Sequence, residues 1–302
     1  VFLRFLGYRN FTPNVYLNEH PTMIYDSSLG WKNQPGEYIF GKYNEVDPGP
    51  TFNFLADGRR KTSIYPIKTD KKILVIGCSY TQGWAISNNE TYSWRLQELL
   101  KSKGVEVLNY GVGGYGTYQS LLMLKEINKT LKVSPELIIY GFYDHHDERN
   151  VATLDWMYSL NKSASRNHIY VPYVNLDEHD NLIYNKPSKL TTFFGRNIFV
   201  SVYSIEKLIL RFFYKNRRDD KITVTKKLIY EMNNFVEKEM NSKLLIVNLQ
   251  KSQNYDYEKA LKDSISFLDA RTSNTNKRGW FVEGDGHPNQ RMNNYWAEGD
   301  LR

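Results

Sequence analysis

The sequence of 302 residues is poor in features that would mark several protein classes. Its single cysteine, Cys78, excludes a disulfide framework and a CxxC metal or redox motif. No apolar run approaches the roughly 18 residues of a membrane-spanning helix, and there is no internal repeat or low-complexity tract. Net charge is modest at +7, from 40 Lys and Arg against 33 Asp and Glu, which permits anionic partners without requiring them. The remaining composition, 41% hydrophobic and 15% aromatic, is that of a globular protein.

The first residues, Val1 to Leu6, are apolar apart from Arg4. They fit two alternatives: the tail of a signal or anchor segment, or an apolar arm packed on the body. The first alternative predicts association with a membrane or cell envelope. We therefore expect an extracytoplasmic protein (secreted, periplasmic or membrane-anchored), with a cytoplasmic location as the alternative.

Residues 1–70 differ from the rest of the chain because they are rich in Tyr, Asn, Pro and Gly and lack a helical period. Turn-forming sequences stand at 26–31 and 47–50, and short strands fit at 37–40 and 51–54. We predict a β-rich N-terminal appendage, residues 1–70, packed on a main domain of residues 71–302.

The main domain alternates short apolar runs with amphipathic segments. Strands are predicted at 73–76, 105–108, 137–140, 244–247 and 265–268, and helices at 91–103, 118–131 and 224–240. This alternation predicts a parallel sheet covered on both faces, a flavodoxin-like three-layer α/β/α sandwich. Residues 150–222 interrupt it with a predicted hairpin (169–173 and 182–184) and a helix at 203–214, an insertion that could serve as a lid or substrate contact.

Ligands of such sheets sit at the carboxyl ends of the strands. The loops after Ile76, Leu108, Tyr140 and Val247 should therefore share one rim. Ser79 follows the first strand there, in a turn whose backbone N–H groups can stabilise an oxyanion. Alone this is a weak signal, because many such serines are helix caps.

Two further segments follow core strands. Residues 109–117 contain four glycines, but lack the Lys-Ser/Thr of a phosphate-binding loop and follow the second strand, so a tight strand-to-helix turn is the alternative interpretation. Near the end, Asp285 and His287 are two residues apart. A serine nucleophile needs a base and an orienting acid, and His287 and Asp285 can supply them.

In this order the segments resemble the SGNH or GDSL hydrolase family. Gly77-Cys78-Ser79-Tyr80-Thr81-Gln82-Gly83 looks like its nucleophile block, residues 109–114 like its glycine block, and residues 285–289 like its terminal block. The resemblance spans about residues 71–290. It implies Ser79 as nucleophile, His287 as base and Asp285 as orienting acid, with an oxyanion hole from the Ser79 and Gly114 N–H groups and an Asn side chain. It implies no cofactor and no metal.

This chain departs from the family pattern in two places. Cys78 replaces the usual Asp before the serine, and the third block, Gly141 to Asp147, has no Asn at the expected position. Tyr143 by direct count, or His145 after a two-residue shift, can supply the missing donor. We predict that a side chain between Tyr143 and His146 points toward the Ser79 hydroxyl; the competing interpretation is a surface loop and a two-donor hole.

Other charged clusters carry weaker signals. The run from Asp144 to Glu148 contains two histidines and permits a metal site, although a polar loop is favoured. Basic clusters at 59–61, 68–72 and 217–218 form no nucleic-acid motif, so a solvated face is expected and no nucleic-acid partner. An anionic glycan or membrane surface is a lesser possibility.

The sequence thus predicts serine-dependent ester hydrolysis through an acyl-enzyme, with an O-acylated carbohydrate or other small ester as substrate because flat aromatic rings stack on sugars. An O-acyltransferase would use the same triad. The alternative from another class is a non-catalytic binding or structural module that retains the fold.

Overall fold

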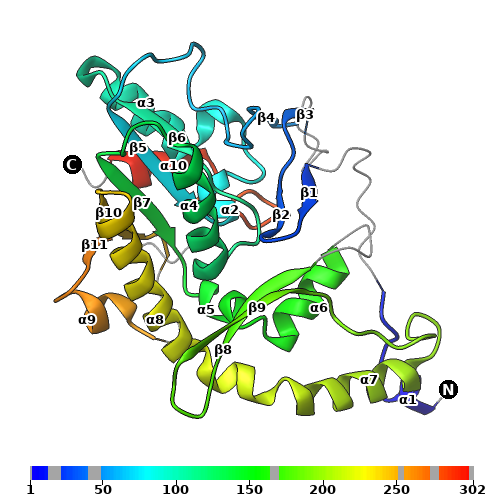
Figure 1. Cartoon of the computed structure of the whole chain (residues 1–302). Helices are drawn as coiled ribbons and strands as arrows, with labels where there is room; N and C mark the ends of the chain where they lie inside the picture. The colour runs from blue at the N-terminus through cyan, green and yellow to red at the C-terminus, as the bar shows by residue number, and fades with distance from the viewer. Residues whose placement is uncertain are drawn as a thin grey trace.

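The computed structural model describes residues 2–12, 22–39, 49–163, 170–250, 255–272 and 279–298. At its centre is a five-stranded sheet in the order β11-β10-β7-β5-β6, with every neighbouring pair parallel (Figure 1). The strands are β5 (Lys72–Gly77), β6 (Glu106–Asn109), β7 (Leu137–Phe142), β10 (Lys243–Asn248) and β11 (Ser266–Asp269). The third, first and second core strands thus lie side by side. This is the flavodoxin-like order, and the predicted fold class is confirmed.

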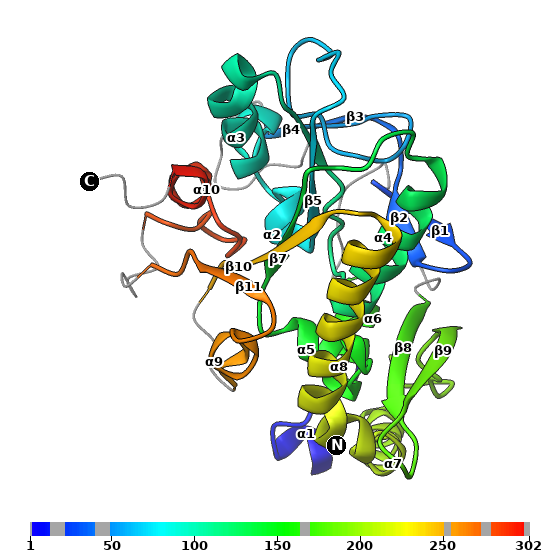
Figure 2. The ribbon, with the colours of Figure 1, turned by 60° about the vertical axis from the view of Figure 1, so that its left-hand side comes forward.

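Helices cover both faces of this sheet because its strands are apolar on both sides. Leu74 and Ile76 of β5 pack in one buried cluster with residues of α4 (Thr117–Thr130) and α8 (Lys215–Glu239). Val75, between them, belongs to the opposite cluster with residues of α3 (Tyr92–Leu100) and α10 (Gln290–Glu298). Figure 2 shows the sheet between these layers.

The insertion after β7 is larger in secondary structure than predicted. It contains α5 (His146–Asn150), α6 (Leu154–Ser163), the antiparallel hairpin β8 (Val171–Leu176) and β9 (Leu182–Ser188), and α7 (Val200–Phe213). The hairpin and α7 match predicted elements, whereas α5 and α6 were not predicted. Helix α8 begins at Lys215 instead of 224, because its first two turns are polar on every side and show no apolar period.

The N-terminal part forms two hairpins. These are β1 (Met23–Asp26) with β2 (Gly30–Asn33), and β3 (Gly36–Ile39) with β4 (Thr51–Phe54). The turn predicted at 26–31 is the first hairpin's loop, where the Asp26 carboxylate accepts hydrogen bonds from the N–H groups of Ser28 and Leu29, both at 2.9 Å. Backbone contacts cross the predicted boundary: the Arg60 N–H donates to the Asn109 carbonyl at 2.8 Å. A separate domain of residues 1–70 stays a prediction.

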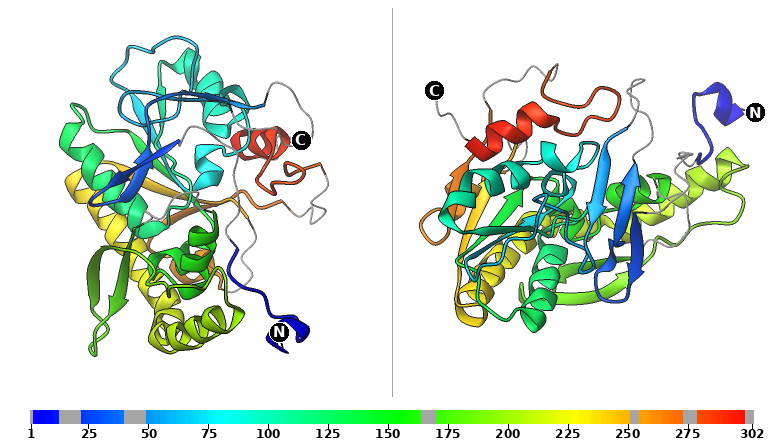
Figure 3. Two further views of the ribbon diagram at one scale, coloured as in Figure 1. Left: turned by 90° about the vertical axis from the view of Figure 1, so that its right-hand side faces the viewer. Right: turned by 90° about the horizontal axis from the view of Figure 1, so that it is seen from above.

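Helix α1 (Phe2–Phe5) lies beside α7, far from the hairpins (Figure 3). The segment after it packs there too: the Phe11 N–H donates to the Arg196 carbonyl at 3.1 Å. Phe11 is buried, whereas residues 4–9 are exposed, so the packed-arm and anchor alternatives both stay predictions. In the described part of the chain, no helix is long and apolar enough to cross a membrane. Val1, Phe40, Asp47, Pro48 and Ile169, which enter predictions above, lie outside the described residues.

Candidate active site

The turn that carries Ser79 begins where β5 ends at Gly77, and short helix α2 (Ser79–Gln82) follows at once. Gly77 has φ +147°, and a Cβ atom there would lie 2.4 Å from Thr81 Oγ1 and 2.8 Å from the Gly141 carbonyl oxygen. Only glycine fits this position. Ser79 takes the first position of α2, where a backbone N–H has no acceptor within the helix. Cys78 is buried at the N-cap with no capping hydrogen bond from its side chain.

The three predicted triad residues lie together. His287 Nε2 is 3.0 Å from Ser79 Oγ, although the two residues are 208 positions apart in the chain. His287 Nδ1 is 2.6 Å from Asp285 Oδ1, which also accepts the His287 backbone N–H at 3.1 Å. With the proton on Nδ1, Asp285 accepts from the imidazole and Nε2 faces the serine hydroxyl. This is the arrangement that nucleophile activation requires.

The loop before α10 is closed by short backbone contacts that fix His287. Val282 N–H donates to the His287 carbonyl at 2.7 Å, and Gly286 N–H donates to the Val282 carbonyl at 2.9 Å. Aromatic rings flank the imidazole, with Tyr80 edge-on at 5.8 Å and Trp84 at 6.2 Å. Tyr80 is itself held, since its hydroxyl donates to Gln250 Oε1 at 3.0 Å.

Tyr143 and His145 are the two candidates for the missing Asn. The ring of Tyr80 lies between His287 and Tyr143, and His145 packs on Tyr143. The Tyr143 ring stacks on Tyr80 at 5.1 Å. Burial raises the pKa of Tyr143 to about 12, so its hydroxyl stays protonated. His145 packs edge-on against Tyr143 and is largely exposed. Neither has a recorded contact with Ser79, and a donor role for either stays a prediction.

His146, also within the predicted range, is engaged elsewhere. Its Nδ1 is 2.7 Å from the Tyr140 hydroxyl, and burial holds its pKa well below the usual value. The two adjacent imidazoles therefore occupy different environments, one exposed and one in the core. Among the described residues, no group of three or more His, Cys, Asp or Glu is arranged to hold a metal ion.

The glycine block is positioned by residues from distant parts of the chain. Gly114 has φ +83°, and a Cβ atom there would lie 3.0 Å from the Trp31 ring and 3.5 Å from the Trp156 ring. Trp31 Nε1 donates to the Gly113 carbonyl at 2.9 Å. On the other side, the Arg149 guanidinium stacks on Trp156 at 4.7 Å. The conformation of the loop is thus fixed from both sides, and the donor role of the Gly114 N–H stays a prediction.

Arg60, from the N-terminal segment, holds the loop that follows α2. Its guanidinium is fully buried and donates to the Gln82 carbonyl at 2.7 Å, to the Ile86 carbonyl at 2.6 Å and also to the Gly83 carbonyl. Burial lowers its pKa to about 9, which still leaves it charged at neutral pH. Arg60 was expected to be part of a solvated basic cluster. That prediction is wrong, because the backbone carbonyls that bind it cannot be recognised from side-chain sequence.

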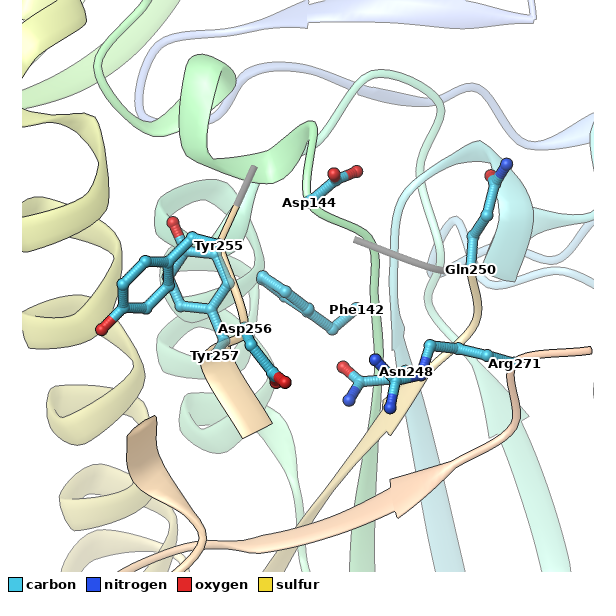
Figure 4. Close-up of a pocket in the computed structure, with 8 residues that line it drawn as sticks. All are labelled: Phe142, Asp144, Asn248, Gln250, Tyr255, Asp256, Tyr257 and Arg271. Atoms are coloured by element: carbon cyan, nitrogen blue, oxygen red, sulfur yellow. The ribbon is translucent and has the colours of Figure 1, made fainter. Parts of the chain in front are cut away.

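A small pocket lies at the ends of β7 and β10. Figure 4 shows the side chains that line it, among them Gln250, the acceptor of the Tyr80 hydroxyl. Its cavity volume of about 10 Å³ is room for about one water molecule. It is too small to hold a substrate.

No protein-family model and no curated protein sequence matches the chain. Among solved structures, it is similar to a member of the lipolytic G-D-S-L protein family from Veillonella parvula, with 13% identity over 75% of this chain and 94% of the other and a TM-score of 0.41. A carbohydrate acetylesterase family member from Sinorhizobium meliloti has 14% identity over 76% and 94%, with a TM-score of 0.39. The psychrotrophic esterase EstA from Pseudoalteromonas has 10% identity over 75% and 92%, with a TM-score of 0.40.

At such identities and TM-scores these neighbours assign no activity to this chain. The fold and the site together define an α/β/α protein with a Ser-His-Asp arrangement at the carboxyl ends of its strands. In it, His287 is hydrogen-bonded to both Ser79 and Asp285.

Proposed function

We propose that this protein is a serine-dependent ester hydrolase that works through an acyl-enzyme. The observation that carries the proposal is the continuous hydrogen-bond path from Ser79 through His287 to Asp285. A structural serine needs no base at 3.0 Å, and a surface histidine needs no buried carboxylate at its inner nitrogen. These residues come from opposite ends of the domain, so local sequence alone does not explain their meeting.

The reaction follows from the atoms in place. Ser79 Oγ attacks the ester carbonyl carbon while His287 Nε2 takes the hydroxyl proton, and the imidazolium forms beside Asp285. His287 then returns this proton to the departing alkoxide, which leaves an acyl-Ser79 ester. Water enters, gives a proton to His287 and attacks the acyl carbon, and the carboxylic acid leaves as Ser79 regains its proton.

Negative charge on the carbonyl oxygen needs hydrogen-bond donors while the tetrahedral intermediate exists. We assign the Ser79 and Gly114 N–H groups to this role, because one begins a helix and the other lies in a fixed glycine turn. The third donor belongs to Tyr143 or His145.

For the substrate, we favour an O-acylated carbohydrate. Two partly exposed tryptophans support this assignment, since Trp84 lies beside His287 and Trp156 beside Gly114. Flat indole rings beside His287 and Gly114 suit the apolar faces of a sugar ring.

The test is labelling with a serine-directed fluorophosphonate, read by mass spectrometry, together with turnover of a small acetyl ester. Wild type should label at Ser79, and Ser79→Ala and His287→Ala should lose both label and turnover by about 10³-fold or more. Ser201→Ala, which removes an exposed hydroxyl on α7, is the matched control and should behave as wild type.

Labelling retained in folded Ser79→Ala contradicts the proposal, and absence of label and turnover in folded wild type favours a binding module. If acetyl groups from the ester appear on an added oligosaccharide instead of in free acetate, the protein is an O-acyltransferase.

A second experiment addresses the third donor. Tyr143→Phe or His145→Ala should lower turnover by about 10²-fold if that residue stabilises the oxyanion. If both variants keep wild-type turnover while Ser79→Ala is inactive, the hole has only its two backbone donors.

A further inference from the structure

Helix α7 carries apolar residues on two faces, and only one of them is covered. Val200 and Leu210 are buried against the insertion. A second group of apolar residues recurs at positions i, i+3, i+4, i+7 and i+8, so it forms a stripe along one side of the helix, and this stripe faces outward. Its members are Ile205, Leu208, Ile209, Phe212 and Phe213. Leu208, Phe212 and Phe213 are 71%, 79% and 71% exposed, so this stripe is not part of the core.

Neighbouring segments extend this exposed stripe into a surface. Before the helix, Phe194, Ile198 and Phe199 are exposed. Phe5, at the end of α1, and Leu6, which follows it, are also exposed, and α1 lies beside α7. We call these five residues and the stripe the α7 face. An exposed apolar stripe of this length is unusual on a monomeric soluble protein and marks an interaction surface.

Basic side chains predominate around the α7 face. Residues 2–12 and 193–218 contain eight Lys and Arg and one acid, Glu206, and the exposed Asp219 follows directly. Glu206 is fully buried and paired with Arg196 at 3.0 Å, so it presents no charge to a partner. Exposed cations of these segments include Arg4, Arg211 and Lys215.

We propose that the α7 face binds the surface of a membrane that contains anionic lipids. Aromatic and aliphatic side chains on one side of a helix enter the boundary between headgroups and acyl chains, and adjacent basic side chains attract anionic headgroups. A second copy of this chain is a poorer occupant, because a self-complementary contact would bring the cations of one face against those of the other.

The place of α7 in the fold gives this binding a direction. Figures 1 and 2 show α7 and α1 beyond α5, on the side of the sheet to which the carboxyl end of β7 leads. Docking by the α7 face therefore brings the membrane to the part of the molecule that contains α7 and α1. The proposal itself is independent of esterase chemistry.

The experiment is co-sedimentation of the full chain with vesicles of phosphatidylcholine, alone or mixed equally with phosphatidylglycerol. We expect binding to the mixed vesicles, with affinity at least about tenfold lower for phosphatidylcholine alone. Phe212→Ser/Phe213→Ser should weaken binding to mixed vesicles by about tenfold or more. Arg211→Gln/Lys215→Gln should weaken it and reduce its dependence on salt.

The matched control is Ile64→Ser/Tyr65→Ser, which removes equally exposed apolar side chains between β4 and β5 and should bind as wild type. Circular dichroism confirms that each variant is folded. Ser79→Ala should also bind as wild type, so a failure of the esterase proposal and a failure of this one are distinguishable.

Three results overturn the proposal: no sedimentation with mixed vesicles, sedimentation unchanged by Phe212→Ser/Phe213→Ser, or equal loss in the control. Light scattering that shows a dimer dissociated by Phe212→Ser/Phe213→Ser, without vesicle binding, assigns the face to a second copy instead.

Discussion

Two segments are added to the same α/β/α core, and they differ in where their most prominent side chains lie: beside the site in one, at the surface in the other. The N-terminal segment, residues 22–62, buries polar side chains, and Arg60, Asn33 and the indole N–H of Trp31 all bond to backbone near the site. The insertion, residues 146–214, leaves large apolar side chains of α7 in solvent. Buried polar groups that are fully bonded fix a geometry, whereas exposed apolar groups await a partner.

The contrast explains why the glycine turns of the site keep their shape. Asn33 Nδ2 donates to the Gly111 carbonyl at 3.0 Å, and its Oδ1 accepts from Gln82 Nε2 at 2.7 Å. One side chain thus joins the loop after β6 to the helix that begins with Ser79. A donor set for an oxyanion must be in position before charge develops, and cross-links of this kind provide that order.

Replacing Arg60 is the strongest test of whether the N-terminal segment holds the loops of the site in place. Arg60→Met keeps the length of the side chain but leaves the carbonyls of Gln82, Gly83 and Ile86 without their buried donor. We expect a loss of about 3–5 kcal/mol in the free energy of unfolding, measured by urea denaturation. Turnover of the acetyl ester should fall with it, because the loop behind Ser79 loses its support.

Arg59→Met is the control at the neighbouring position. Arg59 is partly exposed, and its contacts are ion pairs with Asp57 and Glu106. Such pairs contribute about 0–1 kcal/mol. Equal losses of stability in the two variants would show that the buried contacts of Arg60 contribute no more to stability than surface ion pairs. The N-terminal segment would then not support the site through Arg60.

A second test asks whether the insertion contains a buried polar group that is poorly compensated. Asp147 of α5 is buried, and its recorded ion pair is with Lys221 of α8, 3.4 Å away. Burial raises the pKa of Asp147 to about 6, with Lys221 opposing the shift. The folded state therefore binds a proton more tightly than the unfolded chain, and this carboxyl destabilises the fold as pH rises from about 4 to about 6.

Asp147→Asn should consequently stabilise the protein by about 1–3 kcal/mol at pH 7 and flatten the fall in stability over that pH range. Urea denaturation at several pH values measures both. Glu148→Gln, at a more exposed carboxylate that also contacts Lys221, is the control. A less stable Asp147→Asn at neutral pH would show that the Lys221 pair outweighs the desolvation of the carboxylate.

Trp31 offers a smaller perturbation of the same glycine turn. Trp31→Phe keeps a ring against Gly114 and removes the hydrogen bond to the Gly113 carbonyl. We expect a loss of about 1–2 kcal/mol in stability. Turnover should fall further than stability alone explains, because the Gly114 N–H is displaced. Tyr25→Phe, on the exposed side of the same hairpin, is the control and should change neither quantity.

These contacts mark the limit of what could be predicted from sequence. The five core strands were predicted because each is a short, largely apolar run bounded by polar residues. Ser79, Asp285 and His287 were predicted because each follows such a strand in a recognisable block. Arg60 has no such signal, since its partners are carbonyl groups 22 to 26 residues away. Helices α5 and α6 were missed for a related reason: α5 has only five residues, too few to show an apolar period.

Tyr143 shows the other kind of limit. Its position after β7 was predicted, and β7 does end at Phe142. The direction of its side chain depends on Tyr80 of α2, whose ring stacks on it. A sequence pattern places a residue on the rim, but packing decides what that residue faces.

The smallest expected effect is that of a substitution in the exposed apolar stripe of α7. Leu208 and Leu210 are leucines of the same helix, two residues apart. Leu208 is 71% exposed, whereas Leu210 is only 6% exposed. Leu208→Ala removes side-chain atoms that already contact water, and alanine favours the helix, so the free energy of unfolding should change by no more than about 0.5 kcal/mol. Leu210→Ala leaves a cavity and should cost about 2–5 kcal/mol. Urea denaturation of both variants, without vesicles, measures the difference. A large loss in Leu208→Ala would mean that the outer stripe of α7 is already covered in solution, by a second copy or by another part of the chain, and no longer free to meet a membrane.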